Sequence, residues 1–412
     1  MPVLELTLNA QKVSVDYEHG ASLLEMLRES CGLTAAKDGC SPQGFCGCCT
    51  VLVDGKPALA CLTKAERVAG REVTTLEGLP ERQRRTLAQA FVREGAVQCG
   101  FCTPGITVRA ASLLEKGQAD DPDRVRRALR GHLCRCTGYQ RIVDAIVTAG
   151  EAWSAGSEVA SGPPRRGSFW PPGGQATADA MRPNGVGDPV ERLGGVSQVL
   201  GEKPFVADLK VEDMLHAALV LSDHPRAVVQ SIDVGGAESS HGVERILLAD
   251  DIPGERFIGL IEHDWPVLVA VGETTRYVGD VLAVVVADSQ LHARLAADKV
   301  SVEYDVLEPV TDPFEAQKAG APKVHDSDNL LEVCAYRRGD VDAALAEAEH
   351  VIEERFETQR IEHAFLEPEA CLVIPQHGGL KVYSQGQGVH DDRRQIAAIL
   401  GLDETDIEVE LV

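Results

Sequence analysis

The sequence lacks three features, and each absence excludes a class of protein. Among its 412 residues, no apolar run approaches the roughly 20 residues of a membrane-spanning helix, and the longest candidates, such as 281–287, are strand-sized. Basic residues are scarce, with 40 Lys and Arg against 64 Asp and Glu, so the net charge of −24 argues against a nucleic-acid surface. Neither a Walker loop nor a G-x-G-x-x-G motif is present, so nucleotide and dinucleotide binding are not supported.

A secretory signal peptide is also missing from the beginning of the chain. We therefore expect a cytoplasmic protein whose thiols stay reduced, and no membrane partner. The acidity favours solubility and could also serve contact with a basic partner. A chain of 412 residues is too long for one compact core, so two or three domains are expected.

Cysteine, in contrast, is abundant, and eight of the twelve cysteines form two groups of four. The first group has the spacing C-x5-C-x2-C-x11-C, one residue longer in its first gap than the plant-type [2Fe–2S] pattern. The second group combines a C-x2-C with a later C-x-C. The candidate metal ligands are Cys40, Cys46, Cys49 and Cys61 in the first group, and Cys99, Cys102, Cys134 and Cys136 in the second.

Groups of four thiolates suit [2Fe–2S] clusters or zinc. Structural zinc usually takes paired C-x2-C knuckles, and the C-R-C at 134–136 is tighter than a knuckle. The spacing therefore favours two [2Fe–2S] clusters. Zinc binding is the second interpretation and disulfide bonds are the third. Cys31, Cys334 and Cys371 have no partner by spacing, and we expect them to be buried small apolar residues.

Three segments, CGCCTVLVDGKPALACL, VQCGFCTPG and HLCRCTGYQRIVDAI, occur in this order. They resemble the iron–sulfur portion of the xanthine dehydrogenase and aldehyde oxidoreductase family of molybdenum hydroxylases. The family loop C-G-x-C-T favours Cys49 as the ligand and leaves Cys48 as a surplus thiol. The resemblance also places the equivalents of Gln98 and Cys136 against the pterin, so Cys136 would be both cluster ligand and pterin contact. For Gln98, a hydrogen bond at a helix end is the alternative.

The segments TTRYVGDVLAVVVAD, SVEYDVLEPVTDP and RIEHAFLEPEACLVIP resemble the hammerhead domain of the same family. The last stretch, 378–412, looks like the opening of its molybdopterin-binding domain. There the family glutamine beside the molybdenum aligns with Gln387, and Gln385 is the rival if the register shifts. A solvated loop amide is the alternative. The family's catalytic glutamate is expected beyond Val412, so no catalytic residue is assigned in this chain.

The expected fold class is a multidomain α+β protein. The Asp54-Gly55 turn and the alternation at 3–8 and 12–17 predict two hairpins, and Ser22 to Glu25 opens a short helix with a capping-box pattern. Helices are expected at 81–94, 104–115, 122–133, 139–149, 289–297 and 341–349, and strands at 226–234, 266–271, 281–287, 299–307 and 350–358. The expected domains are a β-grasp, plant-type ferredoxin-like [2Fe–2S] domain (1–79), a four-helix [2Fe–2S] bundle (80–153), a linker containing Phe169-Trp170 (154–188), an α/β hammerhead domain (189–320), and the end of the hammerhead with the start of the molybdopterin-binding domain (321–412).

The resemblance implies an oxidoreductase that hydroxylates an N-heterocycle, such as xanthine, or an aldehyde, with oxygen from water. Two [2Fe–2S] clusters would carry the electrons away from a molybdopterin cofactor. The first-cluster segment is similar to selenium-dependent xanthine dehydrogenases, so a purine is the first expected substrate and an aldehyde the second. No flavin-domain signature lies between Tyr139 and Arg192. The expected partners are the rest of the molybdenum domain or subunit, and a flavoprotein subunit or a ferredoxin- or flavodoxin-like acceptor.

A non-catalytic function is the rival hypothesis: a two-cluster electron-transfer subunit that docks to a molybdenum subunit. A downstream reading frame that begins with a glycine-rich loop would favour the split enzyme instead. Because the base and most walls of the cofactor site are expected beyond Val412, we expect the isolated chain to be incomplete. It would contain iron–sulfur, hold no stoichiometric molybdopterin, and oxidise neither purines nor aldehydes.

Overall fold

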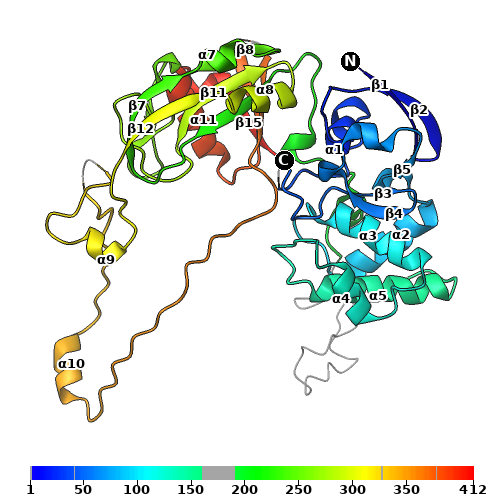
Figure 1. Cartoon of the computed structure of the whole chain (residues 1–412). Coiled ribbons are helices and arrows are strands. Elements are labelled where there is room, and N and C mark those ends of the chain that lie inside the picture. Colours follow the sequence, from blue (N-terminus) through cyan, green and yellow to red (C-terminus); the bar gives the residue numbers. More distant parts are fainter. Residues whose placement is uncertain (1, 41, 160–190, 326–327, 377) are drawn as a thin grey trace. The chain divides into compact units, whose positions relative to one another are not determined.

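The computed structural model describes residues 2–40, 42–159, 191–325, 328–376 and 378–412 (Figure 1). Contacts divide the chain into two compact units, Met1–Leu209 with Glu362–Leu372 and Val412, and Lys210–Ile361 with Val373–Leu411. Each unit contains both helices and strands, which confirms the predicted α+β multidomain class. Most of the predicted linker, including Phe169-Trp170, lies outside the described residues.

The first unit begins with a five-stranded sheet in the order β2-β1-β5-β3-β4. Its two predicted hairpins are confirmed, and the turn between β3 and β4 has positive φ at Asp54 and Gly55. The fifth strand runs parallel to β1 and antiparallel to β3, so it joins the hairpins into one sheet. The strands are β1 (Val3–Leu8), β2 (Gln11–Asp16), β3 (Thr50–Val53), β4 (Lys56–Leu59) and β5 (Glu72–Thr74).

The short helix that follows β2 has the predicted capping box. The Ser22 hydroxyl accepts from the Glu25 N–H, and the Glu25 carboxylate accepts from the Ser22 N–H at 2.8 Å. After one α-helical turn, α1 (Leu23–Glu25), the chain continues as a π-helix, Met26–Ser30. This helix buries Leu23, Leu24 and Leu27.

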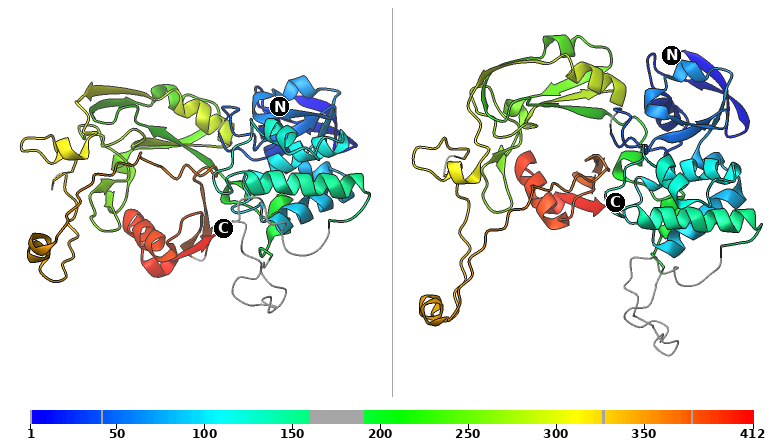
Figure 2. Two further views of the ribbon diagram at one scale, coloured as in Figure 1. Left: turned by 90° about the horizontal axis from the view of Figure 1, so that it is seen from below. Right: turned by 60° about the horizontal axis from the view of Figure 1, so that its bottom comes forward.

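Helices form the rest of the first unit, and α2, α3 and α5 contact one another (Figure 2). Their shared apolar core contains four fully buried large side chains, Phe91, Ile106, Ile142 and Ile146. The fourth helix ends five residues before its predicted end, because the chain turns there toward the second cysteine group. The helices are α2 (Glu81–Glu94), α3 (Thr103–Glu115), α4 (Pro122–Ala128), α5 (Gln140–Ser154) and α6 (Gly195–Val199).

The second unit is built from small sheets. Strands β6 (His216–Leu221), β11 (Val281–Ala287) and β8 (Val243–Leu247) form an antiparallel sheet in the order β6-β11-β8, which contacts α8 (Gln290–Ala297). Strand β7 (Ala227–Asp233) pairs antiparallel with β12 (Ser301–Val306). In place of the predicted strand 266–271, the structure has only the two-residue strand β10 (Trp265–Pro266), which pairs with β9 (Phe257–Ile258). The helices α7 (Gly235–Glu238) and α9 (Pro313–Ala316) are single turns.

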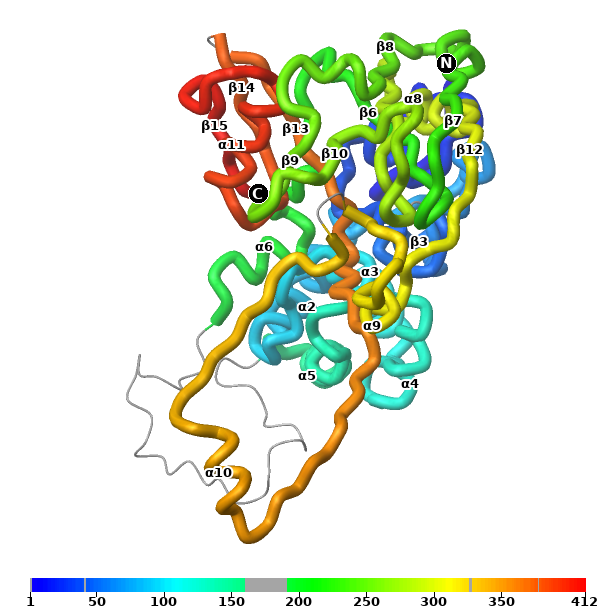
Figure 3. The backbone as a smooth tube through the Cα atoms, turned by 90° about the vertical axis from the view of Figure 1, so that its left-hand side faces the viewer, coloured from blue at the N-terminus to red at the C-terminus, as the bar shows by residue number. Residues whose placement is uncertain are grey.

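The end of the chain forms a further sheet, in the order β13-β14-β15 (Figure 3). Strands β14 (Gly379–Ser384) and β15 (Ile407–Leu411) are parallel, and α11 (Val389–Leu400) connects them. Strand β13 (Cys371–Gln376) lies at the edge. A loop after a parallel strand and before its crossover helix is a common place for ligand contacts.

Two predictions were wrong. Residues 350–358 have no strand pairing, and α10 (Val341–Glu347) is the only helix or strand among the described residues of 328–361. Cys334 lies exposed in that stretch, and Cys371 lies on the exposed face of the edge strand β13, so neither is the buried residue expected; Cys31 is half-buried. Within the described ranges, no helix has both the length and the apolar character needed to cross a bilayer.

Candidate functional site

The hairpin of β3 and β4 brings the third and fourth cysteines of the first group together. Cys49 directly precedes β3, and Cys61 lies in the single turn that follows β4. The Ala60 N–H donates to the Cys49 carbonyl at 3.2 Å, so the two cysteines share one end of the hairpin. Their side chains are hydrogen-bond partners.

The preceding loop brings Cys40 and Cys46 together, and their thiols are also hydrogen-bond partners. Gly44 and Gly47 have φ values of +72° and +71°, which glycine adopts without a steric penalty. A Cβ added at Gly39 would lie 3.3 Å from the Cys46 sulfur. The glycines therefore let the main chain pass close to the thiols.

The second group forms two pairs in the same way. The sulfurs of Cys99 and Cys136 are 3.5 Å apart, and the Cys102 and Cys134 side chains are hydrogen-bond partners. Cys102 is the N-cap residue of α3, so the positive end of the helix dipole lies beside this pair. Cys99 and Cys136 are exposed, Cys134 is half-buried and Cys102 is buried.

This division into pairs fits a two-iron cluster better than a zinc ion. A [2Fe–2S] cluster takes two cysteines on each iron, whereas structural zinc takes four ligands around one ion. Among the residues that the structure describes, no group of three or more Cys, His, Asp or Glu could hold a single metal ion. All twelve cysteines are free thiols, and the 3.5 Å between Cys99 and Cys136 far exceeds a disulfide bond of about 2.05 Å.

The surroundings favour the thiolate, which is the form that binds metal, at Cys46 and Cys61 in the first group and at Cys134 in the second. A hydrogen bond with the Cys48 thiol is the main cause that lowers the pKa of Cys46 to about 6, against the opposing effect of burial. A hydrogen bond with Cys102 lowers the pKa of Cys134 to about 5. The Thr137 hydroxyl, 3.1 Å from the Cys134 sulfur, contributes in the same direction.

The two cysteine groups are connected by direct contacts between their loops. The Leu133 N–H, next to Cys134, donates to the Cys46 carbonyl at 2.8 Å. A Cβ added at Gly105 in α3 would lie only 2.4 Å from the Gly47 carbonyl oxygen, so helix and loop meet at van der Waals distance. The loop of the first group and the helical second group therefore pack as one structure.

His132 is a residue of this contact that the sequence reasoning missed. It is buried, and its Nε2 lies 3.1 Å from the hydroxyl of Thr50, the residue that follows Cys49 in the sequence. Burial, with the nearby Arg109, lowers the pKa of His132 to about 4, so the ring is neutral at pH 7. Its position within the GHLCRC motif is the only sequence signal that could have marked it.

Two of the three predicted pterin contacts lie together. The Gln98 amide donates to the Cys136 carbonyl at 3.1 Å, and both residues are exposed. Arg135, between the last two cysteines, donates to the carbonyls of Glu362 and His363 at 2.7 and 2.6 Å. That anchor, which sequence alone did not indicate, fastens residues of the 362–372 segment beside the second cysteine group.

The third predicted contact, Gln387, belongs to the other compact unit. It is exposed in the loop between β14 and α11, at the carboxyl end of a parallel strand. Its rival Gln385 is half-buried, and its side-chain oxygen is buried without a hydrogen-bond partner. An unsatisfied buried amide of this kind usually indicates a missing partner, so both glutamines remain candidates.

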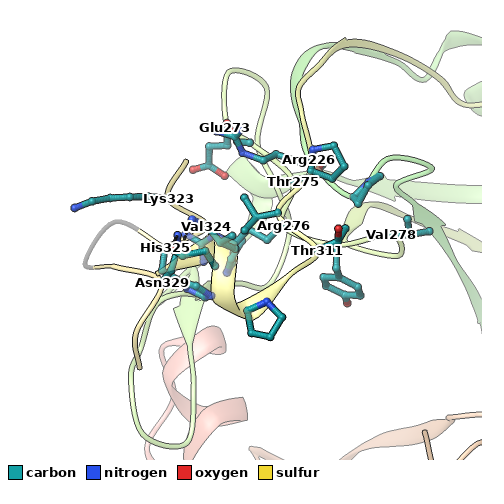
Figure 4. Close-up of a pocket in the computed structure, with 18 of the residues that line it drawn as sticks. Arg226, Glu273, Thr275, Arg276, Val278, Thr311, Lys323, Val324, His325 and Asn329 are labelled. Atoms are coloured by element: carbon teal, nitrogen blue, oxygen red, sulfur yellow. Dashed lines mark hydrogen bonds between the residues drawn. The ribbon is translucent and has the colours of Figure 1, made fainter. Parts of the chain in front are cut away.

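The second unit also contains a cavity of about 890 Å³ that no predicted site residue lines (Figure 4). Its walls include Arg226, Arg276 and Glu273. Arg226 donates to the Glu308 carbonyl at 3.0 Å, and the Glu273 carboxylate accepts from Arg256 at 2.9 Å. Charged side chains of both signs line the cavity, and Arg226 and Glu273 already have partners within the protein. The lining therefore does not favour an anionic over a cationic ligand.

Three family models match separate parts of the chain. The model "[2Fe-2S] binding domain" matches residues 75–147. The model "Aldehyde oxidase and xanthine dehydrogenase, a/b hammerhead domain" matches residues 200–308. The model "Molybdopterin cofactor-binding domain" matches residues 324–411.

Curated relatives match nearly the whole chain, about half of it, or about a third of it. The aldehyde oxidoreductase of Megalodesulfovibrio gigas is 30% identical over 97% of this chain, but the chain covers only 44% of that relative. The nicotinate dehydrogenase small FeS subunit of Eubacterium barkeri is 42% identical over 35% of this chain and 91% of the subunit. The xanthine dehydrogenase iron-sulfur-binding subunit of Escherichia coli O157:H7 is 43% identical, with the same two coverages.

Solved structures show the same relationship. The aldehyde oxidoreductase from Desulfovibrio gigas superposes with a TM-score of 0.81 at 28% sequence identity. The match covers 100% of this chain and 46% of the other. The chain therefore spans less than half the length of the aldehyde oxidoreductases that it matches.

Proposed function

The chain belongs to the xanthine dehydrogenase and aldehyde oxidoreductase family of molybdenum hydroxylases, and from this we propose that it holds two [2Fe–2S] clusters and part of a molybdopterin site. It is an oxidoreductase with a [2Fe–2S]-binding domain and a molybdopterin cofactor-binding domain. The observation that carries the proposal is the arrangement of eight cysteines in four close pairs.

The proposed ligands are the eight cysteines of those pairs: Cys40, Cys46, Cys49 and Cys61 for the first cluster, and Cys99, Cys102, Cys134 and Cys136 for the second. When bound, the molybdenum cofactor accepts two electrons from substrate and the [2Fe–2S] clusters accept one electron each. The protein's contribution is to bury the first site, to direct the N-terminus of α3 at the second, and to hold both loops in contact.

Proposed molybdopterin contacts are Gln98 and Cys136 in the first unit and Gln387 in the second, with Gln385 as the alternative to Gln387. The exposed pair Cys99 and Cys136 supports this, because a cluster there would be accessible to a neighbouring cofactor. The side-chain amide of Gln98 already donates to the Cys136 carbonyl, which fixes its orientation beside the cluster ligand.

The proposed reaction is the hydroxylation of an electrophilic C–H carbon with oxygen from water. We propose an N-heterocycle, with a purine such as xanthine first, and an aldehyde second. The names of the relatives support both classes, since they include xanthine and nicotinate dehydrogenases and an aldehyde oxidoreductase. The proposed partners are further molybdenum-domain polypeptide and a flavoprotein or ferredoxin-like acceptor. The domain boundaries and the cytoplasmic location predicted from sequence remain part of this proposal.

A second candidate is a non-catalytic electron-transfer subunit. It is favoured by the relatives that are named as iron–sulfur subunits and that match about a third of the chain. This candidate does not explain why a hammerhead domain and a molybdopterin-binding domain follow in the same chain.

Metal analysis tests the cluster assignment. If both groups bind [2Fe–2S], anaerobically purified protein should contain about four irons and four sulfides per chain. After reduction, electron paramagnetic resonance should show two distinct signals. Zinc without sulfide at either site would contradict the assignment.

Activity separates the two candidate functions. The protein should be purified together with every polypeptide that copurifies, and assayed with xanthine and with an aromatic aldehyde in ¹⁸O-labelled water. We expect molybdenum in the preparation, reduction of a dye acceptor, and one labelled oxygen in the product. A preparation with full clusters and molybdenum that oxidises neither substrate class would contradict the enzymatic proposal and favour the electron-transfer subunit.

A further inference from the structure

The C-x2-C loop of the second cysteine group is flanked by a segment that follows the predicted linker, residues 192–208. The helix of this segment, α6, contacts α2 and α3. Val199 of α6 is fully buried in the apolar core that also contains Phe101 of the loop. A Cβ added at Gly195 would lie 3.0 Å from the Val92 side chain, so α6 packs directly on α2. The segment is therefore part of the structure that surrounds the second group.

Two side chains of the segment contact the loop itself. The Nε2 of Gln198 donates to the Cys99 carbonyl at 3.1 Å, although 99 positions separate the two residues in sequence. The rings of Phe205 and Phe101 meet edge to face, with their centroids 5.1 Å apart. A Cβ added at Gly100 would lie 3.1 Å from the Gln198 Cβ, so the main chain of the loop lies against this side chain. Three consecutive residues of the loop thus contact the segment.

The orientation of the Gln198 carboxamide is fixed at both of its ends. Gln198 is only 5% exposed, and its Oε1 accepts from the Arg192 Nε at 2.7 Å. Because a guanidinium group donates and never accepts, the carboxamide oxygen must face Arg192, and the amino group must then face the Cys99 carbonyl. The hydrogen bond to Cys99 therefore has a defined donor and a defined direction.

A similar contact holds the other exposed cysteine of the group. The Gln98 amide donates to the Cys136 carbonyl at 3.1 Å. Cys99 and Cys136 are both exposed, and their sulfurs lie 3.5 Å apart. Because solvent surrounds much of both residues, the distance between their sulfurs depends on how firmly the main chain is held at each of them. One glutamine amide binds the carbonyl of each.

We propose that Gln198 is a positioning residue for the second cluster: its amide holds the main chain at Cys99, so that the Cys99 sulfur stays paired with the Cys136 sulfur. This rests on the proposed function, because it requires Cys99 to be a cluster ligand. Gln198 acts through Cys99 and does not itself bind the cluster. The hold on this ligand comes from beyond the predicted linker, so the polypeptide that continues into the hammerhead domain also contributes to the iron–sulfur site.

The test measures how fast each cluster of the whole protein loses iron to bathophenanthroline disulfonate under anaerobic conditions. Electron paramagnetic resonance at successive times follows the two clusters separately, and the signal that remains in Cys49→Ser identifies the second. In Gln198→Glu the donor is lost while the shape and the Arg192 contact are kept, and Gln198→Met removes both hydrogen bonds. In both variants we expect the second cluster to lose iron about three- to tenfold faster, and its signal to broaden.

Two controls accompany these variants. The first cluster is the internal control, and its rate of iron loss should not change. Ser197→Ala is the matched control on the same helix, since the Ser197 hydroxyl donates to the Gly194 carbonyl at 2.8 Å, within α6 and its N-cap. We expect both clusters of Ser197→Ala to behave as in the wild type.

Three outcomes separate this inference from the proposed function. Unchanged iron loss and an unchanged signal of the second cluster in Gln198→Glu overturn the positioning role only. Equal acceleration at both clusters overturns it too, because Gln198 would then only stabilise the fold. If Gln198→Met does not fold, Gln198→Glu decides, since it keeps the shape of the side chain. A wild-type protein without [2Fe–2S] clusters contradicts the proposed function itself.

Discussion

Replacement of Asp208 by alanine is expected to destabilise the first unit by about 3–5 kcal/mol, the usual cost of removing one partner from a buried ion pair. Asp208 bridges Arg28, at 2.8 Å, and the ammonium of Lys37. The three side chains are 3%, 8% and 1% exposed, so their charges are well removed from water. Without Asp208, two buried cations would lose their common anion.

The control for this prediction is Glu202→Ala. Glu202 pairs with Arg84 at 3.0 Å, but its side chain is 52% exposed, so its loss should cost between 0 and about 1 kcal/mol. Urea denaturation monitored by circular dichroism compares the two variants. If both have the same unfolding midpoint, the buried network does not have the energetic role assigned here.

The loss in Asp208→Ala should also depend on pH. Burial lowers the pKa of Lys37, and Asp208 is the main group that opposes this. In the variant the folded state should therefore bind fewer protons than the unfolded state, and its stability should rise with pH. Glu367, whose carboxyl pKa is raised by burial and then by Asp208, also faces Lys37 and could replace part of the lost charge.

Replacement of Cys49 by serine is expected to abolish the first cluster, so that iron falls from about four to about two per chain. Cys49 and Cys61 are the pair of ligands that the hairpin of β3 and β4 brings together. A serine hydroxyl is a poorer ligand for iron than the cysteine thiolate that it replaces. The neighbouring substitution Cys48→Ser is the matched control and should retain about four irons. Iron analysis and the number of paramagnetic signals measure both.

The reverse pattern, with the cluster lost in Cys48→Ser and kept in Cys49→Ser, would falsify the ligand assignment. It would mean that the fifth residue of the first gap shifts the ligand register by one. The hairpin geometry argues against such a shift, since the Ala60 N–H donates to the carbonyl of Cys49.

Local patterns predicted most of this fold. The capping box at Ser22, the turn at Asp54-Gly55 and the helix 81–94 each depend on residues close together in sequence, and the structure confirms them. The cysteine groups belong to the same category, because their spacing alone separates them into two sets.

Long-range contacts were beyond sequence reasoning. Asp208 is 180 residues from Arg28, and His132 is 82 residues from Thr50. No local pattern distinguishes these residues from ordinary surface groups, because their partners are chosen by tertiary packing. The strand prediction for 350–358 was wrong for the same reason. The alternation of this stretch suits a strand, but among the described residues no neighbouring strand pairs with it.

The four cysteine pairs also differ in the length of chain that each must close. In the first group the partners are 6 and 12 residues apart, whereas in the second they are 32 and 37 apart. Closing a loop of 37 rather than 12 residues costs about 1 kcal/mol more in chain entropy. The first cluster site therefore needs less chain closure than the second, which requires the helices to assemble. Because the Leu133 N–H also donates to the Cys46 carbonyl, unfolding of the helical region should release the second cluster first and loosen the loop that holds the first.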